Sequence, residues 1–154
     1  MSGGRIHAFP AGTGRDGSGR TLAQVLAFDD ARIEGVHDFI QWCFPLPEAS
    51  RAVPGAPVLS AREAEAIRAD PAALAGLRAA LARMRRFYDE TEFWLRAHDH
   101  NHLRISRILS AVRALLGPAE AEAFLALVTA RNAERGAPVN ADSLRYWRDA
   151  LGRG

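Results

Sequence analysis

Apolar residues recur every three or four positions along most of this chain, and capping residues or prolines separate the runs. The first run begins after Thr21, which is followed three residues later by Gln24, the spacing of a capping box. A second run covers 31–44, behind a pair of Asp residues and before a proline. The pattern therefore predicts helices over about 22–28 and 31–44.

Proline then dominates a connection over 45–60, which is long for a compact chain. Ser60 with Glu63 repeats the capping-box spacing, and an Asp-Pro pair opens the longest amphipathic run. The segment 89–101 has no clear period, and its structure stays open. Further helices are predicted over about 61–69, 71–88, 101–116, 118–136 and, behind Asn140, 141–151.

Few residues are β-branched, and no segment alternates with a period of two for long. The fold class predicted is therefore all-α. We expect a single-domain helical bundle of about six or seven helices over 19–154, with the Pro-rich connection inside it. Residues 1–18 are rich in glycine and predict a flexible N-terminal arm.

The chain has 154 residues, 48% apolar and 25% charged, which is ordinary for a soluble globular domain. Its formal net charge of +2 is too low for a strong nucleic-acid binder. The single cysteine, Cys43, leaves no internal disulfide and is interpreted as a core thiol. Neither a secretory signal nor a membrane-length apolar run is visible. We expect a cytoplasmic protein with no cofactor and no nucleic-acid partner.

All 20 positions that carry Lys or Arg are Arg. A genome rich in G and C explains this usage, because the codons for Arg, Ala, Gly and Pro are GC-rich. The alternative is selection for the planar guanidinium, which binds anions in a bidentate way. Composition therefore does not identify a reaction.

Two phosphate-binding patterns occur in the glycine-rich start of the chain. Residues 12–17 match GxGxxG, and 14–21 approximate GxxxxGK[ST] with Arg20 at the Lys position. Both motifs need a buried parallel strand before them and other strands beside it. Because no later segment reads as a parallel strand, the sequence predicts a glycine-rich lead into a helix and not a nucleotide site.

The densest polar cluster is His98-Asp99-His100-Asn101-His102. Three His and an Asp this close could bind Zn²⁺ or a redox metal. Two pairs with i, i+3 spacing, Glu34 with His37 and Asp99 with His102, resemble half of a di-metal site in a helical bundle. The alternative function is thus a metal-dependent enzyme that uses the His98, His100 and His102 cluster, and the simpler interpretation is a capped start of a buried helix. The alternative metal ligands are Glu34, His37, His98, Asp99 and His102.

Several segments together resemble the conserved region of opioid growth factor receptors. These segments are Gly19-Arg20-Thr21-Leu22, the run from His37 to Arg51, Ala56-Pro57-Val58-Leu59-Ser60 and the run from Asn101 to Leu109. The resemblance covers roughly residues 19–117 and is that of a bacterial-type, single-domain member. Animal members are described as receptors for an enkephalin-type peptide that associate with membranes and the nucleus. The resemblance therefore implies a receptor-like binding module with a peptide or protein ligand and association with the membrane periphery, and it supplies no catalytic residues.

The two longest of these segments mix core residues with polar ones that periodicity does not require. We hypothesise that they pack side by side and form one pocket with an aromatic wall and guanidinium groups, suited to a carboxylate-bearing ligand such as a peptide C-terminus. The competing interpretation is that the polar side chains hold down the connection over 45–60. The predicted ligand-binding residues are His37, Gln41, Trp42, Arg51, His100, Asn101, Arg104 and Arg107.

Overall fold

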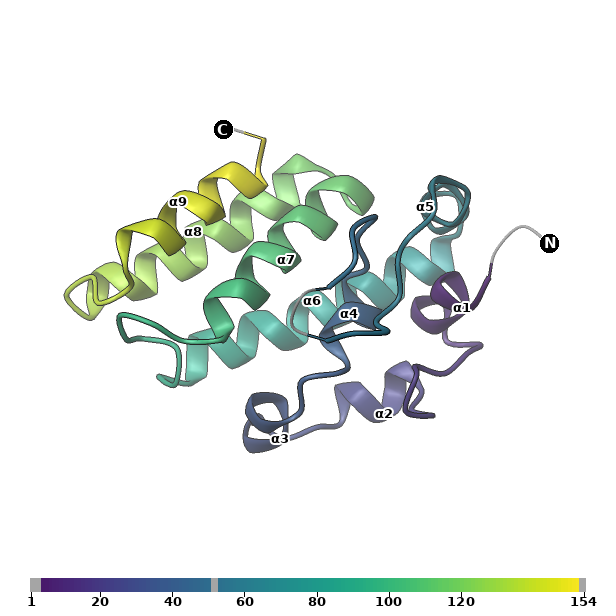
Figure 1. Cartoon of the computed structure of the whole chain (residues 1–154), viewed down its shortest axis with the longest axis horizontal. Coiled ribbons are helices and arrows are strands. Elements are labelled where there is room, and N and C mark those ends of the chain that lie inside the picture. The colour runs from purple at the N-terminus through teal and green to yellow at the C-terminus, as the bar shows by residue number, and fades with distance from the viewer. Residues whose placement is uncertain (1–3, 51–52, 153–154) are drawn as a thin grey trace. The chain divides into compact units, whose positions relative to one another are not determined.

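The computed structural model describes residues 4–50 and 53–152, and all regular structure in those ranges is helical (Figure 1). The predicted all-α class is confirmed, and so is the long Pro-rich connection, because the described part of 44–60 contains no helix. None of the described helices combines the length and the apolar character needed to cross a membrane. The nine helices of the described ranges are α1 (Arg5–Ala11), α2 (Leu22–Leu26), α3 (Asp30–Gly35), α4 (Ile40–Cys43), α5 (Ala61–Arg68), α6 (Pro71–Glu90), α7 (Asn101–Leu115), α8 (Pro118–Glu134) and α9 (Ala141–Ala150).

Contacts between Cα atoms divide the chain into two compact units, residues 1–82 and 83–154. Helices α1 to α5 belong to the first unit and α7 to α9 to the second, while α6 begins in the first and ends in the second. The sequence predicted one domain over 19–154, and its hydrophobic pattern does not mark this subdivision.

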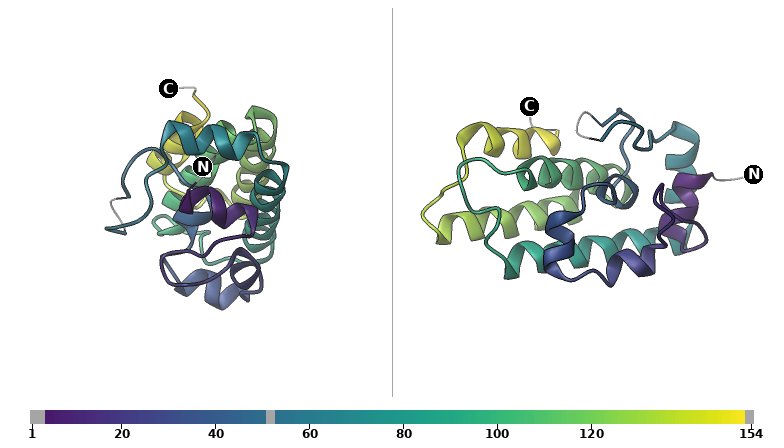
Figure 2. Two further views of the ribbon diagram at one scale, coloured as in Figure 1. Left: turned by 90° about the vertical axis from the view of Figure 1, so that its right-hand side faces the viewer. Right: turned by 60° about the horizontal axis from the view of Figure 1, so that its bottom comes forward.

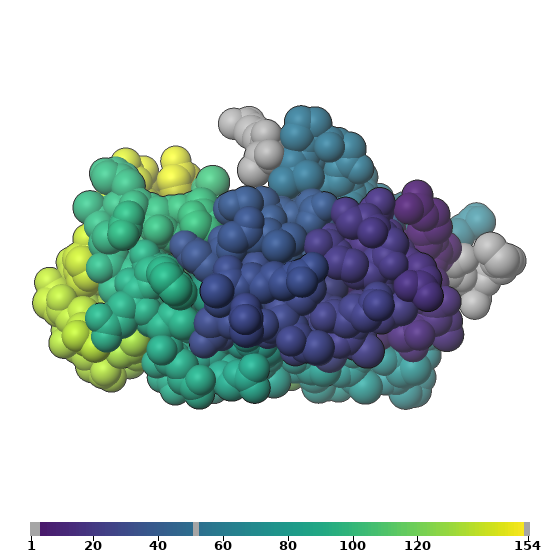
Figure 3. Space-filling view, turned by 90° about the horizontal axis from the view of Figure 1, so that it is seen from below, coloured from purple at the N-terminus to yellow at the C-terminus, as the bar shows by residue number. Residues whose placement is uncertain are grey.

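Helix α1 lies where the sequence predicted a flexible arm. Ile6 and Phe9 of this helix are buried, and α1 packs against α4 and α5. It also approaches α6 closely, since a Cβ atom at Gly76 would lie 1.9 Å from the carbonyl oxygen of Pro10. The arm prediction is wrong for the described residues 4–18, because this segment carries part of the core of the first unit. In Figure 3 the segments from α1 to α3 form one continuous surface of that unit.

The single helix predicted over 31–44 is also wrong, because the chain breaks into α3 and α4. Helix α3 ends at Gly35, and Val36 is extended with φ −99° and ψ 127°. The break carries Asp38, whose carboxylate binds the side chains of Ser18 and Arg20. These distant partners hold the backbone out of the helical path, although the apolar spacing continues across the break. The split, together with α1, explains why the structure has more helices than predicted.

The second unit packs α7 against both α8 and α9 (Figure 2). Its core is aromatic, with Tyr88 and Trp94 in edge contact at 5.5 Å between ring centroids. Tyr88 also contacts Phe124 at 6.0 Å, and Trp94 contacts Trp147 at 6.3 Å. All four side chains are completely buried. This cluster ties the end of α6 to α8, α9 and the loop that precedes α7.

The segment that periodicity left open, 89–101, is resolved as the end of α6, a loop and the first residue of α7. Trp94 anchors the loop, because its indole N–H donates to the carbonyl of Tyr88 at 3.2 Å. Arg131 of α8 donates to the carbonyls of Tyr88 and Thr91, at 3.4 and 3.0 Å, and so satisfies the end of α6. The loop is therefore fixed by long-range polar contacts rather than by its own periodicity.

Candidate ligand-binding pockets

The glycine-rich loop between α1 and α2 binds its own carboxylate. Oδ1 of Asp16 accepts the backbone N–H groups of Ser18 and Arg20, each at 2.9 Å, and Oδ2 accepts Nε–H of Arg20 at 2.7 Å. Gly19 makes the turn with a φ of +82°, which favours glycine. The side chain of Asp16 has no exposed surface. Backbone donors of this loop thus face a carboxylate within the chain, in agreement with the prediction of a structural lead into a helix.

The same loop is tied to the break between α3 and α4. Arg20 donates a second bond from its guanidinium to Asp38 at 2.6 Å, and the Ser18 hydroxyl donates to the other oxygen of that carboxylate at 2.6 Å. These two partners, Ser18 first and Arg20 next, hold the pKa of Asp38 below its ordinary value. Two of the four segments that carry the resemblance, one with Arg20 and one with Asp38, are thereby joined by direct side-chain contacts.

The first unit has a pocket of about 390 Å³, here called the Trp42 pocket. This volume lies within the range of about 300–1,000 Å³ that is usual for small-ligand sites. Trp42, from α4, forms its aromatic wall, and a Cβ atom at Gly17 would lie 3.6 Å from the indole nitrogen. The pocket is lined by Arg5, Ile6, Gly17, Trp42, Gly55, Pro57 and Glu63.

Two charged side chains of the Trp42 pocket differ in their surroundings. The carboxylate of Glu63 accepts the backbone N–H groups of Ile6 and His7, at 3.1 and 3.2 Å, so it caps the start of α1 and not that of its own helix. The guanidinium of Arg5 lies over the ring of Trp42, 5.3 Å from its centroid. Arg5 is exposed, and among the described residues no carboxylate pairs with it. The pocket therefore offers an indole face and a guanidinium that is free to bind an anion.

The second unit has a smaller pocket of about 170 Å³ between α7 and α9, here called the His102 pocket. Leu103 and Tyr146 line this pocket and are 66% and 52% exposed. They are two of the four large apolar or aromatic side chains that are exposed among the described residues. The pocket is lined by His98, Asp99, His102, Leu103, Ser106, Asn140, Ser143 and Tyr146.

His102 is 4% exposed and both of its ring nitrogens have partners. Nε2 lies 2.8 Å from the carbonyl oxygen of Trp94, and Nδ1 lies 3.3 Å from the hydroxyl of Ser143. A carbonyl only accepts, so Nε2 carries the proton and Nδ1 presents its lone pair to Ser143. Burial lowers the pKa of His102, which favours this neutral form.

The predicted ligand-binding residues are divided between the two units. In the first unit, Trp42 lines the pocket described above, and the Gln41 amide donates to the carbonyl of His37 at 3.1 Å. Arg51 lies outside the described residues. The other four, His100, Asn101, Arg104 and Arg107, lie in the second unit at the start of α7. The joint pocket of the two segments therefore stays a prediction.

Asn101 has the clearest structural role among these residues. Its amide oxygen lies 3.2 Å from the Tyr88 hydroxyl, and its amide nitrogen donates to Asp99 at 2.8 Å. The side chain is completely buried. Asn101 thus joins the aromatic core to the start of α7.

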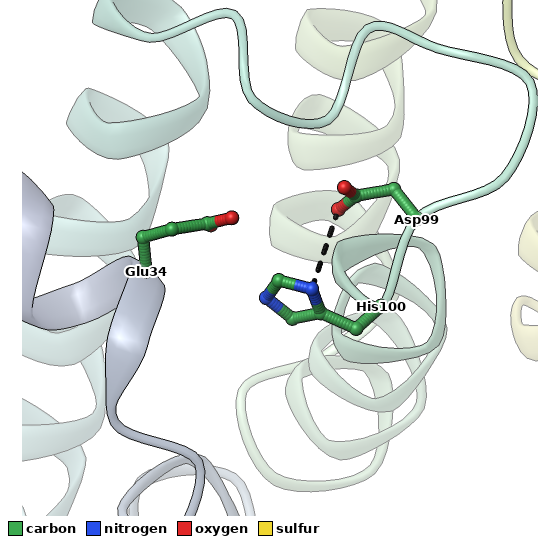
Figure 4. Close-up of side chains that lie close together, drawn as sticks. All are labelled: Glu34, Asp99 and His100. Atoms are coloured by element: carbon green, nitrogen blue, oxygen red, sulfur yellow. Dashed lines mark ion pairs between the residues drawn. The ribbon is translucent and has the colours of Figure 1, made fainter.

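The alternative metal ligands are also divided. Glu34 and His37 belong to the first unit, whereas His98, Asp99 and His102 line the His102 pocket. In the second unit these three do not bring ligand atoms within 4.8 Å of one another. Figure 4 shows the Asp99 carboxylate facing the ring of His100, 3.8 Å away, with Glu34 of α3 also drawn. The metal-dependent enzyme stays a prediction.

Sequence reasoning missed several pocket residues. Arg5 and Gly17 escaped it because they lie in the segment predicted as an arm, and Glu63 because its spacing matched a capping box. The sequence did contain one indication of the His102 pocket. Leu103 is apolar but lies off the buried face of its helix, which Ile105 and Ile108 mark. No family model, curated protein or solved structure matches the chain.

Proposed function

We propose that the chain is a binding module, receptor-like by its resemblance to the opioid growth factor receptor conserved region, and that its Trp42 pocket takes the carboxylate of a peptide or similar ligand. The observation that carries the proposal is Arg5, an exposed guanidinium stacked on Trp42 beside a pocket of about 390 Å³. A guanidinium binds a carboxylate through two parallel hydrogen bonds, and an indole face packs against the apolar part of a ligand.

The stacked arrangement also favours binding because it limits the freedom of the arginine before a ligand arrives. A guanidinium over an indole ring gains about 0.5–1 kcal/mol at an exposed site and keeps its N–H edges available. Glu63 is the carboxylate of the lining, and it accepts two backbone N–H groups at the start of α1. It therefore caps α1 and forms no ion pair with Arg5.

The resemblance supports the same location. Trp42 and Pro57 belong to two of its segments, and Gly17 lies two positions before a third. Conserved-region residues thus supply the wall of the pocket, while Arg5 lies outside the resemblance. Association with the membrane periphery follows from the resemblance alone and is part of the proposal only in that sense.

The proposal is tested by nuclear magnetic resonance titration with N-acetyl-leucine and with its amide. Each is added to about 10 mM, which is high enough to reveal binding with a Kd of about 1 mM, equivalent to about −4 kcal/mol. We expect the carboxylate, and not the amide, to shift the indole N–H signal of Trp42. Arg5→Ala abolishes the shift, whereas Arg62→Ala, on the surface of α5, leaves it unchanged.

A second pair of variants separates the pocket from its arginine. Gly17→Leu fills the space against Trp42, because a Cβ at Gly17 already reaches van der Waals distance of the ring. Gly35→Leu is its control, since a Cβ there has no neighbour within 4 Å. Equal shifts with acid and amide, or binding that survives both Arg5→Ala and Gly17→Leu, would contradict the proposed function.

A further inference from the structure

We propose that Ser143 is a nucleophile activated by His102, and that the second unit accepts acyl groups from small activated esters. Ser143 Oγ lies 3.3 Å from Nδ1 of His102 inside the His102 pocket. This is slightly beyond the usual 2.6–3.2 Å, as is common before a substrate binds. The inference concerns a different unit from the Trp42 pocket and does not rest on it.

The imidazole is oriented as a base by the core of the unit. The carbonyl of Trp94 fixes the proton on Nε2, which leaves the lone pair of Nδ1 directed at Ser143. Trp147 packs edge-on against the ring, with centroids 5.9 Å apart, and its indole N–H donates to the carbonyl of His102 at 3.0 Å. The carbonyl of Trp94 thus takes the orienting place that an Asp holds in a Ser-His-Asp triad, without the negative charge.

A third side chain acts on the serine oxygen. The amide nitrogen of Asn140 donates to Ser143 Oγ at 2.9 Å, while its amide oxygen accepts the backbone N–H of Ser143 at 2.8 Å. The donated bond stabilises negative charge on Oγ, and the hydroxyl proton remains for His102. The same contacts make Asn140 the cap of α9, so the competing role of this network is purely structural.

The pocket restricts the acyl group by its size. At about 170 Å³ it is smaller than usual small-ligand sites of about 300–1,000 Å³, so it fits an acetyl or propionyl ester and not a long chain. Ser110 lies one turn beyond Ser106 on α7 and is not among the lining residues. It therefore provides a serine control outside the pocket.

The reaction is balanced as follows. Ser143 Oγ attacks the carbonyl carbon of the ester, its proton passes to Nδ1 of His102, and the bond to the leaving oxygen breaks as that oxygen takes the proton from Nδ1. The serine is now an ester. Water then attacks the same carbon, gives a proton to Nδ1, and the carboxylic acid leaves as Ser143 Oγ regains the proton.

The chain is favourable for an acylation experiment because it contains no lysine. Cys43 does not compete either, since burial raises the pKa of its thiol to about 12. Incubation with p-nitrophenyl acetate should release a burst of p-nitrophenol close to one equivalent, and mass mapping should place the acetyl group on Ser143.

We expect Ser143→Ala to abolish the burst, because it removes the attacking oxygen, and Ser110→Ala, on α7 outside the pocket lining, to leave the burst unchanged. His102→Gln should lower the acylation rate by about 100-fold, as loss of general-base assistance does, and circular dichroism checks that the variants remain folded. A burst that survives Ser143→Ala, an acetyl group mapped only to Tyr146 or the N-terminal amine, or no burst at all would show that the network is only a helix cap.

Discussion

Replacing Asp16 by Ala should strongly destabilise the first unit, although the residue lies in a glycine-rich loop. The change removes the acceptor for the backbone N–H groups of Ser18 and Arg20 and for Nε–H of Arg20. The carboxylate has no exposed surface, whereas Arg20 is 16% exposed and keeps its bond to Asp38.

The loss of unfolding free energy expected for Asp16→Ala follows from those contacts. Removing one partner of a buried ion pair costs about 3–5 kcal/mol, and hydrogen bonds to a charged group contribute about 1.5–3 kcal/mol each. Because Arg20 retains Asp38 and reaches water, we take the lower end, about 3 kcal/mol. In a chain of this length each kcal/mol shifts Tm by about 2–4 °C, so Asp16→Ala should lower Tm by about 6–12 °C.

Thermal unfolding followed by circular dichroism measures this difference, and hydrogen exchange should show the amides of Ser18 and Arg20 losing protection. Asp16→Asn keeps the acceptor for both amides but sets an NH₂ group or an uncharged oxygen against Arg20, so it should cost about half as much. Asp29→Ala, which removes the cap of α3, is the control and should cost about 1 kcal/mol. An Asp16→Ala variant no less stable than Asp29→Ala would refute the reasoning.

Two further predictions concern one residue in each unit. Gly76→Ala should destabilise the chain by about 1–3 kcal/mol or more in urea unfolding, because its Cβ would overlap the Pro10 carbonyl, and Gly35→Ala should not. For His102, burial lowers the pKa of the folded state, so the unfolded chain takes up the proton first as the pH falls. The free energy of unfolding should therefore decrease below about pH 6.5, by at most about 1.4 kcal/mol per pH unit, until the folded ring is protonated too. His102→Gln should remove this part of the pH dependence, and an unchanged profile would contradict it.

The sequence predicted those parts of the fold that depend on neighbouring residues. Caps at Thr21, Ser60 and Asn140 occur as expected, since each involves a side chain and a backbone group three positions apart. Helix α1 was missed because it has no side-chain cap of its own and a proline inside, and its capping carboxylate belongs to Glu63, 57 positions beyond Ile6. Likewise, the break before α4 depends on distant partners.

The pockets show the same difference between features that depend on neighbouring residues and features that depend on distant ones. Trp42 was predicted as a ligand-binding residue because an aromatic side chain stood among polar residues that periodicity did not require. Arg5 could not be paired with it from the sequence, since their contact depends on how α1 packs against α4. For His102, the cluster of His residues indicated a chemical role, but the partners that decide its protonation are Trp94 and Ser143.

The loop around Asp16 has a consequence for how glycine-rich motifs are interpreted. Its converging backbone N–H groups form the kind of nest that holds a phosphate in nucleotide-binding proteins, yet here the anion is covalently part of the chain. Because the Asp16 carboxylate is part of the chain, it cannot dissociate or be exchanged, and the anion site of the loop is always occupied. A glycine-rich motif and its loop geometry thus indicate that the loop binds an anion. Whether that anion is a ligand depends on whether the loop contains an acidic residue that can bind there itself.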